Sequence, residues 1–169
     1  MRNKLKREAG VNFFTAKGRF ILKGVIKNGL DTCRLINLII CFESPEEFRM
    51  QDFPVPPNLF YINEISFSEA LGVLIHYFNM SEKTAKRKIS DWVDKFKLQR
   101  IQYDTVCESY EEVVRQANLK VVRTKGESHR IGESDVKIIS GFLKEKVNIV
   151  HARDKGLEET CKELGLNVV

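Results

Sequence analysis

The segment VIKNGLDTCRLINLIICF, residues 25–42, passes from a short strand into a helix, with an aspartate at the junction. Residues 25–30 predict a strand that ends at Asp31. Apolar residues at positions 35, 36, 38, 39, 40 and 42 predict a largely buried helix over 33–42. A strand that leads directly into a helix is the repeating unit of α/β folds, and the functional residues of such folds gather beyond the carboxyl ends of their strands. Asp31 is therefore the first candidate for a functional residue.

Strands and helices alternate through the rest of the chain. Further strands are expected at residues 59–65, 147–150 and 167–169, and further helices at 66–78, after Ser81, at about 105–117, after Gly132 and at 155–164. Since alternating elements of this kind form a parallel sheet covered by helices, the sequence predicts an α/β fold, a three-layer α/β/α sandwich with a central parallel sheet. Residues 44–47 suggest a short helix and residues 54–57 a proline-rich linker.

The N-terminal part of the chain differs from the rest in charge. Residues 1–27 contain eight Lys and Arg residues and one acid, Glu8. Residues 11–26, with Phe13, Phe14, Phe20 and Ile21 around Ala16-Lys17-Gly18, predict a β-hairpin. We therefore divide the chain into a basic N-terminal arm or hairpin, 1–24, and one α/β domain, 25–169. A basic arm on a mildly acidic body suggests a polyanionic partner, and a solvated tail is the alternative.

Composition narrows the class of protein. The chain has 169 residues, of which 43% are hydrophobic and 30% charged, as in a water-soluble domain. No apolar run reaches the roughly 18 residues of a membrane span, and no apolar stretch follows the charged N-terminus as a secretory signal would require. We therefore expect a cytoplasmic protein with no membrane contact. Its four cysteines then stay reduced, and their spacing does not suggest zinc.

Four acids fall at corresponding places in the predicted fold: Asp31, Glu69, Asp135 and Asp154. Asp31 and Asp154 follow predicted strands, and Glu69 and Asp135 lie in the first turns of predicted helices. Each acid has a structural explanation of its own, as a helix cap, as part of the capping box Ser66-x-x-Glu69, or as a charge at a helix N-terminus. Together they would repel one another unless a cation lay among them, and Mg²⁺ prefers such oxygen ligands.

The sequences around these acids resemble, in order, the acidic motifs of the PIN domain. The matching stretches are LDTCRLI (30–36), ISFSEA (65–70), IGESDVKI (131–138) and ARDKG (152–156), and the resemblance covers roughly residues 25–169. PIN domains are small α/β/α sandwiches, and many are Mg²⁺- or Mn²⁺-dependent ribonucleases, including the toxins of VapBC toxin–antitoxin pairs. The resemblance implies a ribonuclease that acts on RNA, with a homodimer and an antitoxin-type protein as further partners to consider.

The resemblance also implies roles for individual residues. Asp31, Glu69, Asp135 and Asp154 would be the metal ligands and catalytic acids, for Mg²⁺ or Mn²⁺, and Thr32 matches the hydroxyl residue that commonly follows the first acid. Two positions depart from the family pattern: Cys33 stands where Asn is frequent, and Ala152 where Thr or Ser is usual. The loss of the hydroxyl at position 152 would weaken the positioning of substrate or water.

Three other functions remain open. A non-catalytic RNA- or protein-binding module would keep the fold without turnover, and a toxin of a toxin–antitoxin pair would require an antitoxin. A phosphatase could use Asp31 as its nucleophile, although Cys33 stands where a second Asp is common in such enzymes.

Several secondary residues have two interpretations each. Glu133 is either an extra ligand or a solvent-facing acid, His129 and Arg130 either contact phosphate or form an ordinary loop, and the basic residues Lys83, Lys86, Arg87 and Lys88 either follow an RNA backbone or are solvated. Trp92 and Phe96 are interpreted as packing or dimer contacts.

Overall fold

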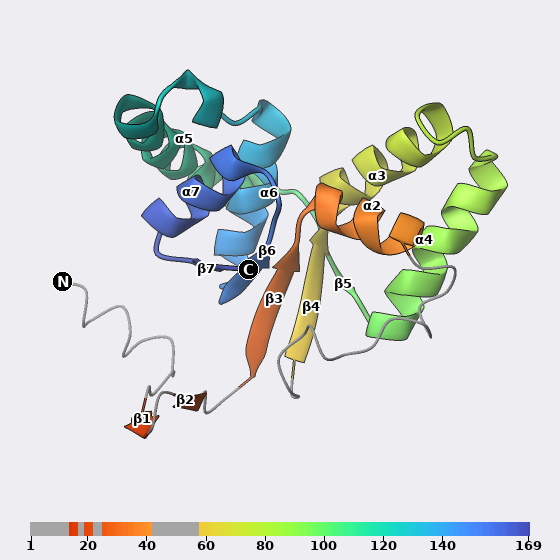
Figure 1. Ribbon diagram of the computed structural model, residues 1–169, viewed down its shortest axis with the longest axis horizontal. Coiled ribbons are helices and arrows are strands. Elements are labelled where there is room, and N and C mark those ends of the chain that lie inside the picture. The colour runs from red at the N-terminus through yellow and green to blue at the C-terminus, as the bar shows by residue number, and fades with distance from the viewer. Residues whose placement is uncertain (1–13, 17–18, 22–24, 42–57) are drawn as a thin grey trace.

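A five-stranded parallel sheet forms the centre of the molecule (Figure 1). The computed structural model describes residues 14–16, 19–21, 25–41 and 58–169. The strands are β3 (Ile26–Leu30), β4 (Asn58–Asn63), β5 (Gln99–Ile101), β6 (Ile149–His151) and β7 (Asn167–Val168), in the order β5-β4-β3-β6-β7. Every neighbouring pair is parallel. The expected α/β sandwich with a central parallel sheet is therefore confirmed.

Helices cover both faces of the sheet (Figure 1). One layer consists of α2 (Thr32–Cys41), α3 (Glu64–His76) and α4 (Glu82–Phe96), and the other of α5 (Thr105–Lys125), α6 (Glu133–Lys144) and α7 (Lys155–Glu163). A short 3₁₀ helix, η2 (Glu127–His129), lies between α5 and α6. None of the helices described is long and apolar enough to span a membrane.

The alternation of side chains along the strands produces two separate cores, one on each face of the sheet. Phe60 and Ile62 of β4 join the core under α2, α3 and α4, whereas Tyr61 between them packs against the core of α5, α6 and α7. Gly29 of β3 allows the second core to approach closely, because a Cβ atom at this position would lie 2.8 Å from the Phe142 ring.

The direction of the chain reverses at the centre of the sheet. Helix α2 carries the chain from β3 to β4 over one face, while α7 carries it from β6 to β7 over the other. Since β3 and β6 are neighbours, the connections after them diverge to opposite faces. In open α/β sheets the crevice at such a switch point is where ligands bind. Asp31 and Asp154 follow these two strands.

Three expectations about the elements were wrong. Helix α3 begins at Glu64 rather than Ser66, because Asn63 is its N-cap and accepts a hydrogen bond from the Ile65 N–H (2.9 Å). Ser66 is buried inside the helix, so the predicted capping box with Glu69 is absent and Glu69 lies in the second turn. Helix α5 continues to Lys125 instead of ending near residue 117, and β5 was not predicted.

The expected N-terminal hairpin is present in the part of the chain that the structure describes. Strands β1 (Phe14–Ala16) and β2 (Arg19–Ile21) pair antiparallel, with Ala16 opposite Arg19. The expected helix at residues 44–47 and the proline-rich linker at 54–57 lie outside the described residues. The division into an arm (1–24) and a domain (25–169) stays a prediction.

Candidate metal centre

Asp31 occupies the switch point directly after β3. Its backbone N–H donates to the His151 carbonyl (3.1 Å), which ties the end of β3 to the end of β6. The side chain is buried, with 3% of the residue exposed, and it accepts hydrogen bonds from the Thr32 and Cys33 backbone N–H groups. Its Oδ2 atom has no hydrogen-bond partner among the described residues. Burial of a carboxylate oxygen without a hydrogen-bond donor raises the free energy of the folded chain. A cation bound at this atom would offset that free energy.

The other three carboxylates each use one oxygen for a hydrogen bond within the protein. Glu69 Oε2 accepts from the Thr32 hydroxyl (2.8 Å), which joins α3 to α2. Asp135 Oδ2 accepts from the Gly132 N–H (3.0 Å) at the start of α6. Asp154 is the N-cap of α7, and its Oδ1 accepts from the Leu157 N–H (2.9 Å). These contacts match the structural explanations for Asp135 and Asp154, and none uses both oxygens of a carboxylate.

The pKa values indicate that the four acids share one region. The pKa of Asp31 is raised to about 6: burial is the largest cause and the negative charges of Asp135 and Glu69 add to it, while the backbone N–H groups of Thr32 and Cys33 act in the opposite direction. Burial also raises the pKa of Asp135, with added repulsion from Asp154 and Glu69. Asp135 is therefore within electrostatic range of each of the other three acids, although the four come from separate parts of the chain.

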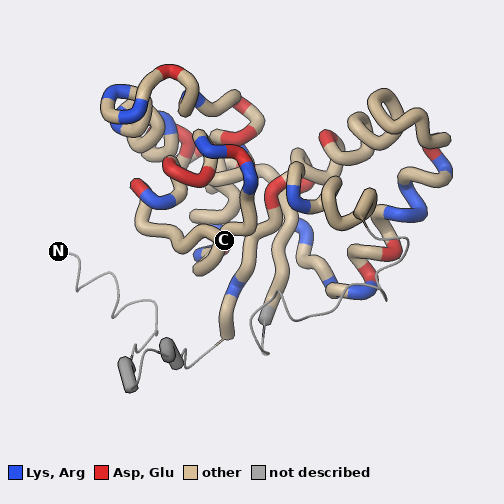
Figure 2. Tube along the Cα trace, in the orientation of Figure 1, with Lys and Arg blue, Asp and Glu red and all other residues tan. Residues whose placement is uncertain are grey.

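Cys33 lies among these acids. The residue is exposed, but partial removal of its thiol from water, followed in size by the charges of Asp31, Asp154, Asp135 and Glu69, raises the pKa of the thiol to about 11. Figure 2 shows acidic segments of both helical layers near the ends of β3 and β4. Sequence reasoning noted Cys33 as a departure from the family pattern but could not place it within the acidic region.

As placed, the side chains do not form a complete metal-binding group. Among the described residues, no three His, Cys, Asp or Glu side chains are arranged to hold one ion. The donor set nevertheless fits a hard divalent cation: four carboxylates, mutual repulsion that raises the pKa values of Asp31 and Asp135, and the unpartnered Asp31 Oδ2. An ion at Asp31 would require these carboxylates to lie closer together than they do here.

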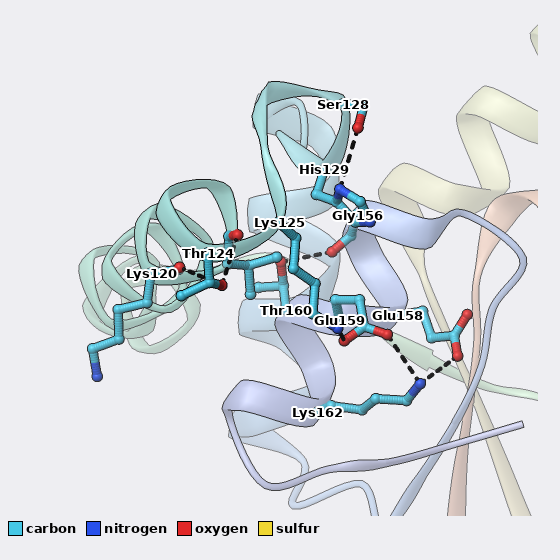
Figure 3. Close-up of polar contacts among 11 residues, drawn as sticks. Lys120, Thr124, Lys125, Ser128, His129, Gly156, Glu158, Glu159, Thr160 and Lys162 are labelled. Atoms are coloured by element: carbon cyan, nitrogen blue, oxygen red, sulfur yellow. Dashed lines mark hydrogen bonds and ion pairs between the residues drawn. The ribbon is translucent and has the colours of Figure 1, made fainter.

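A buried polar network holds the segments that carry Asp135 and Asp154 together (Figure 3). Asn118 of α5 donates to the His129 carbonyl and to the Thr160 hydroxyl, both at 2.9 Å. Thr160 in turn donates to the Gly156 carbonyl (2.7 Å) in the first turn of α7. A Cβ atom on Gly156 would lie 2.7 Å from the His129 carbonyl oxygen. The turn before Gly132 is therefore fixed against the start of α7, which limits how far the two acids can separate.

A second polar contact lies beneath the site. His151 Nε2 and Asn28 Oδ1 lie 3.0 Å apart, across β6 and β3, and both residues are buried. Burial and the nearby positive charge of Arg34 lower the pKa of His151 to about 4, so the imidazole is neutral at pH 7. The structure thus supports a structural role for His151.

The secondary candidates are placed as follows. Glu133 is exposed and pairs with Arg115 (2.7 Å), which favours the solvent-facing interpretation. Arg130 pairs with Glu127 (2.6 Å) in a polar loop. Trp92 and Phe96 stack on each other at 5.4 Å in the core region under α4, as expected for packing residues.

Among the comparisons with known proteins, only the one with solved structures gives matches. No protein-family model matches the chain, and no curated protein matches its sequence. A chain in the crystal structure of VapBC2 from Rickettsia felis, bound to a promoter DNA fragment, superposes with a TM-score of 0.63 at 14% identity, covering 85% of this chain and 98% of that one.

Two further solved structures give similar values. A chain of DNA-bound VapBC from Salmonella typhimurium has a TM-score of 0.58 at 16% identity, covering 85% of this chain and 97% of that chain. A chain of FitAcB from Neisseria gonorrhoeae has a TM-score of 0.53 at 16% identity, covering 83% and 95%. At these identities the likeness concerns the fold: the protein has the α/β/α architecture found in VapBC and FitAB structures.

Proposed function

We propose that this protein is a metal-dependent endoribonuclease that hydrolyses RNA phosphodiester bonds at Asp31, Glu69, Asp135 and Asp154, with Mg²⁺ or Mn²⁺. The observation that carries the proposal is the Asp31 carboxylate: it is buried at the switch point of the sheet, its Oδ2 has no partner among the described residues, and the charges of Asp135 and Glu69 act on it. Asp154 acts in turn on Asp135. A binding module without chemistry would have little reason to bury an unpaired carboxylate beside other acids.

Each residue has a role that its contacts support. Asp31 would provide the inner ligand through Oδ2, while Asp135 and Asp154 would contribute the oxygens that their caps leave free. The Thr32 hydroxyl holds Glu69 Oε2, so Oε1 can accept a proton from the attacking water or bind a second ion. A bound divalent ion would stabilise charge on the scissile phosphate and lower the pKa of a coordinated water.

The fold also supports a biological setting for this activity. Solved structures that share it include VapBC, FitAcB and FitAB structures, three of which are described as bound to DNA. We therefore propose that the chain is the toxin half of a toxin–antitoxin pair, regulated by a small antitoxin-type protein. Coexpression of the adjacent open reading frame would test this setting, since it should relieve any growth arrest that the chain causes alone.

The test of the chemistry is cleavage of an end-labelled RNA during a titration with Mn²⁺ or Mg²⁺. Wild type should cleave only with metal, and Asp31→Asn should lose at least about a hundredfold in rate. Asp91→Asn, which removes an exposed carboxylate on α4, is the matched control and should cleave like wild type. Equal trace cleavage by wild type and Asp31→Asn would leave the non-catalytic binding module as the better description.

A further inference from the structure

Two aromatic side chains are exposed at the turn between α3 and α4. Tyr77, the C-cap of α3, has 83% of its surface exposed, and Phe78 has 41%. The two rings lie against each other, with centroids 5.8 Å apart and planes inclined by 58°. The turn is fixed by hydrogen bonds from the Tyr77 and Phe78 N–H groups to the Val73 carbonyl (2.9 and 3.3 Å). Large exposed aromatic groups held on a rigid turn are typical of a contact surface.

Basic residues follow this turn in the first half of α4. Residues 82–90 contain four Lys and Arg residues and one acid, Glu82, which pairs with Lys86 (2.5 Å), while Asp91 and Asp94 lie in the second half of the helix. Lys83 and Arg87 are exposed, four residues apart on one face of α4, and make no ion pair with any residue that the structure describes. Figure 2 shows basic segments along α4. The surface thus combines two aromatic rings with two cations that make no ion pair among the described residues.

The same helix connects this surface to the acidic site. Glu69 lies in α3 and Tyr77 is the C-cap of the same helix, eight positions further along the chain. At a rise of about 1.5 Å per residue, the two positions lie about 12 Å apart along the helix axis. A strand whose phosphate lies at the acids can therefore reach the aromatic turn with its flanking nucleotides.

We propose that Tyr77, Phe78, Lys83 and Arg87 form a docking surface for single-stranded RNA, on which bases stack on the rings and phosphates contact the two cations. As a route to catalysis the surface rests on the proposed ribonuclease function. RNA is favoured over a protein partner because the combination of exposed rings and unpaired cations is the one that binds single strands without sequence preference. It also provides the positive charge that the acidic centre lacks for a polyanionic substrate.

The test is the affinity of the full chain for a fluorescently labelled, unstructured single-stranded RNA, measured by anisotropy in EDTA so that no cleavage occurs. Tyr77→Ala should weaken binding roughly tenfold, whereas Tyr77→Trp should retain it, because stacking needs a ring. The double variant Lys83→Ser and Arg87→Ser should weaken binding and reduce the slope of log K against log salt by about 1.4. Val113→Ala and Arg123→Ser on α5 are the matched controls and should bind like wild type.

The outcomes separate this proposal from the proposed function. Unchanged RNA affinity in Tyr77→Ala and in the Lys83 and Arg87 double variant would overturn the docking surface, even if the chain cleaves RNA. A change in oligomeric state on mass photometry, with RNA affinity unchanged, would assign the surface to a protein contact and would also overturn it. Tyr77-dependent RNA binding without metal-dependent cleavage would keep the surface and refute the nuclease.

Discussion

Replacing Asp31 with asparagine should make the metal-free protein more stable at neutral pH. Burial holds the pKa of this carboxyl at about 6 in the folded chain, against 3.8 for the free side chain. Between these values the folded chain binds more protons than the unfolded chain, so the free energy of unfolding falls as the pH rises. At about 1.4 kcal/mol per pKa unit, the ionised Asp31 costs the fold about 3 kcal/mol above pH 6.

Asparagine removes this cost while keeping an oxygen for the Thr32 and Cys33 N–H groups. For a chain of this size, about 3 kcal/mol corresponds to a rise in Tm on the order of 6 to 12 °C. Thermal unfolding in EDTA should therefore give a higher Tm for Asp31→Asn than for wild type at pH 7.5, and the difference should disappear below about pH 4. Asp91→Asn provides the control for loss of an exposed charge.

Addition of Mn²⁺ should reverse the order of stability. An ion that binds the folded chain alone stabilises it by mass action, so the wild-type Tm should rise with the concentration of Mn²⁺ while that of Asp31→Asn stays constant. A variant that is less stable than wild type in EDTA at pH 7.5 would refute the reasoning, because it would mean that the Asp31 carboxylate is already satisfied by its neighbours.

Three further outcomes follow from the structure. Gly29→Ala places a Cβ atom 2.8 Å from the Phe142 ring and should cost about 1–3 kcal/mol of unfolding free energy in a urea titration. Asn118→Leu removes the donor to His129 and Thr160, which should cost about 1–3 kcal/mol and also weaken Mn²⁺ binding measured by calorimetry. Removal of metal with EDTA should abolish RNA cleavage by wild type, and readdition of Mn²⁺ should restore it.

The order of the main elements could be predicted because their apolar periodicity is strong. The sequence shows the apolar residues Leu35, Leu38 and Ile39 that α2 buries. It also shows that the spacing of apolar residues changes from that of a strand to that of a helix after β4. Strand β5 was missed because Ile101 is buried while Gln99 and Arg100 are exposed, which leaves too few apolar positions to show an alternation. Its place in the sheet depends on pairing with β4, which a local pattern does not contain.

The predicted start of α3 depended on which polar residue caps the helix. Asn63 and Ser66 are both good N-cap residues, and the sequence favoured Ser66 because Glu69 completes a capping box. In the structure Asn63 caps the helix, its Nδ2 also reaching the Lys137 carbonyl on α6 (3.4 Å), a long-range contact that local sequence does not reveal. This displacement places Glu69 in the second turn, where its carboxylate meets the Thr32 hydroxyl.

For the site, the sequence pointed to the four acids as candidates, but it did not predict their burial or their hydrogen-bond partners. Their positions after strands predicted that Asp31 and Asp154 would lie at one edge of the sheet if the two strands were neighbours, and in the structure β3 and β6 are neighbours. The unpartnered Oδ2 of Asp31, the place of Cys33 among the acids and the Asn118 network all arise from contacts between distant segments. The roles of the four acids and of Thr32 stay predictions that metal binding and cleavage must test.

A crystal structure of the protein soaked in Mn²⁺, with anomalous scattering recorded near the manganese absorption edge, tests the central claim most directly. The account predicts an anomalous peak in bonding contact with Asp31 Oδ2 and with an oxygen of Asp135 or Asp154. The absence of a peak at Asp31, with manganese bound elsewhere or nowhere, would contradict it.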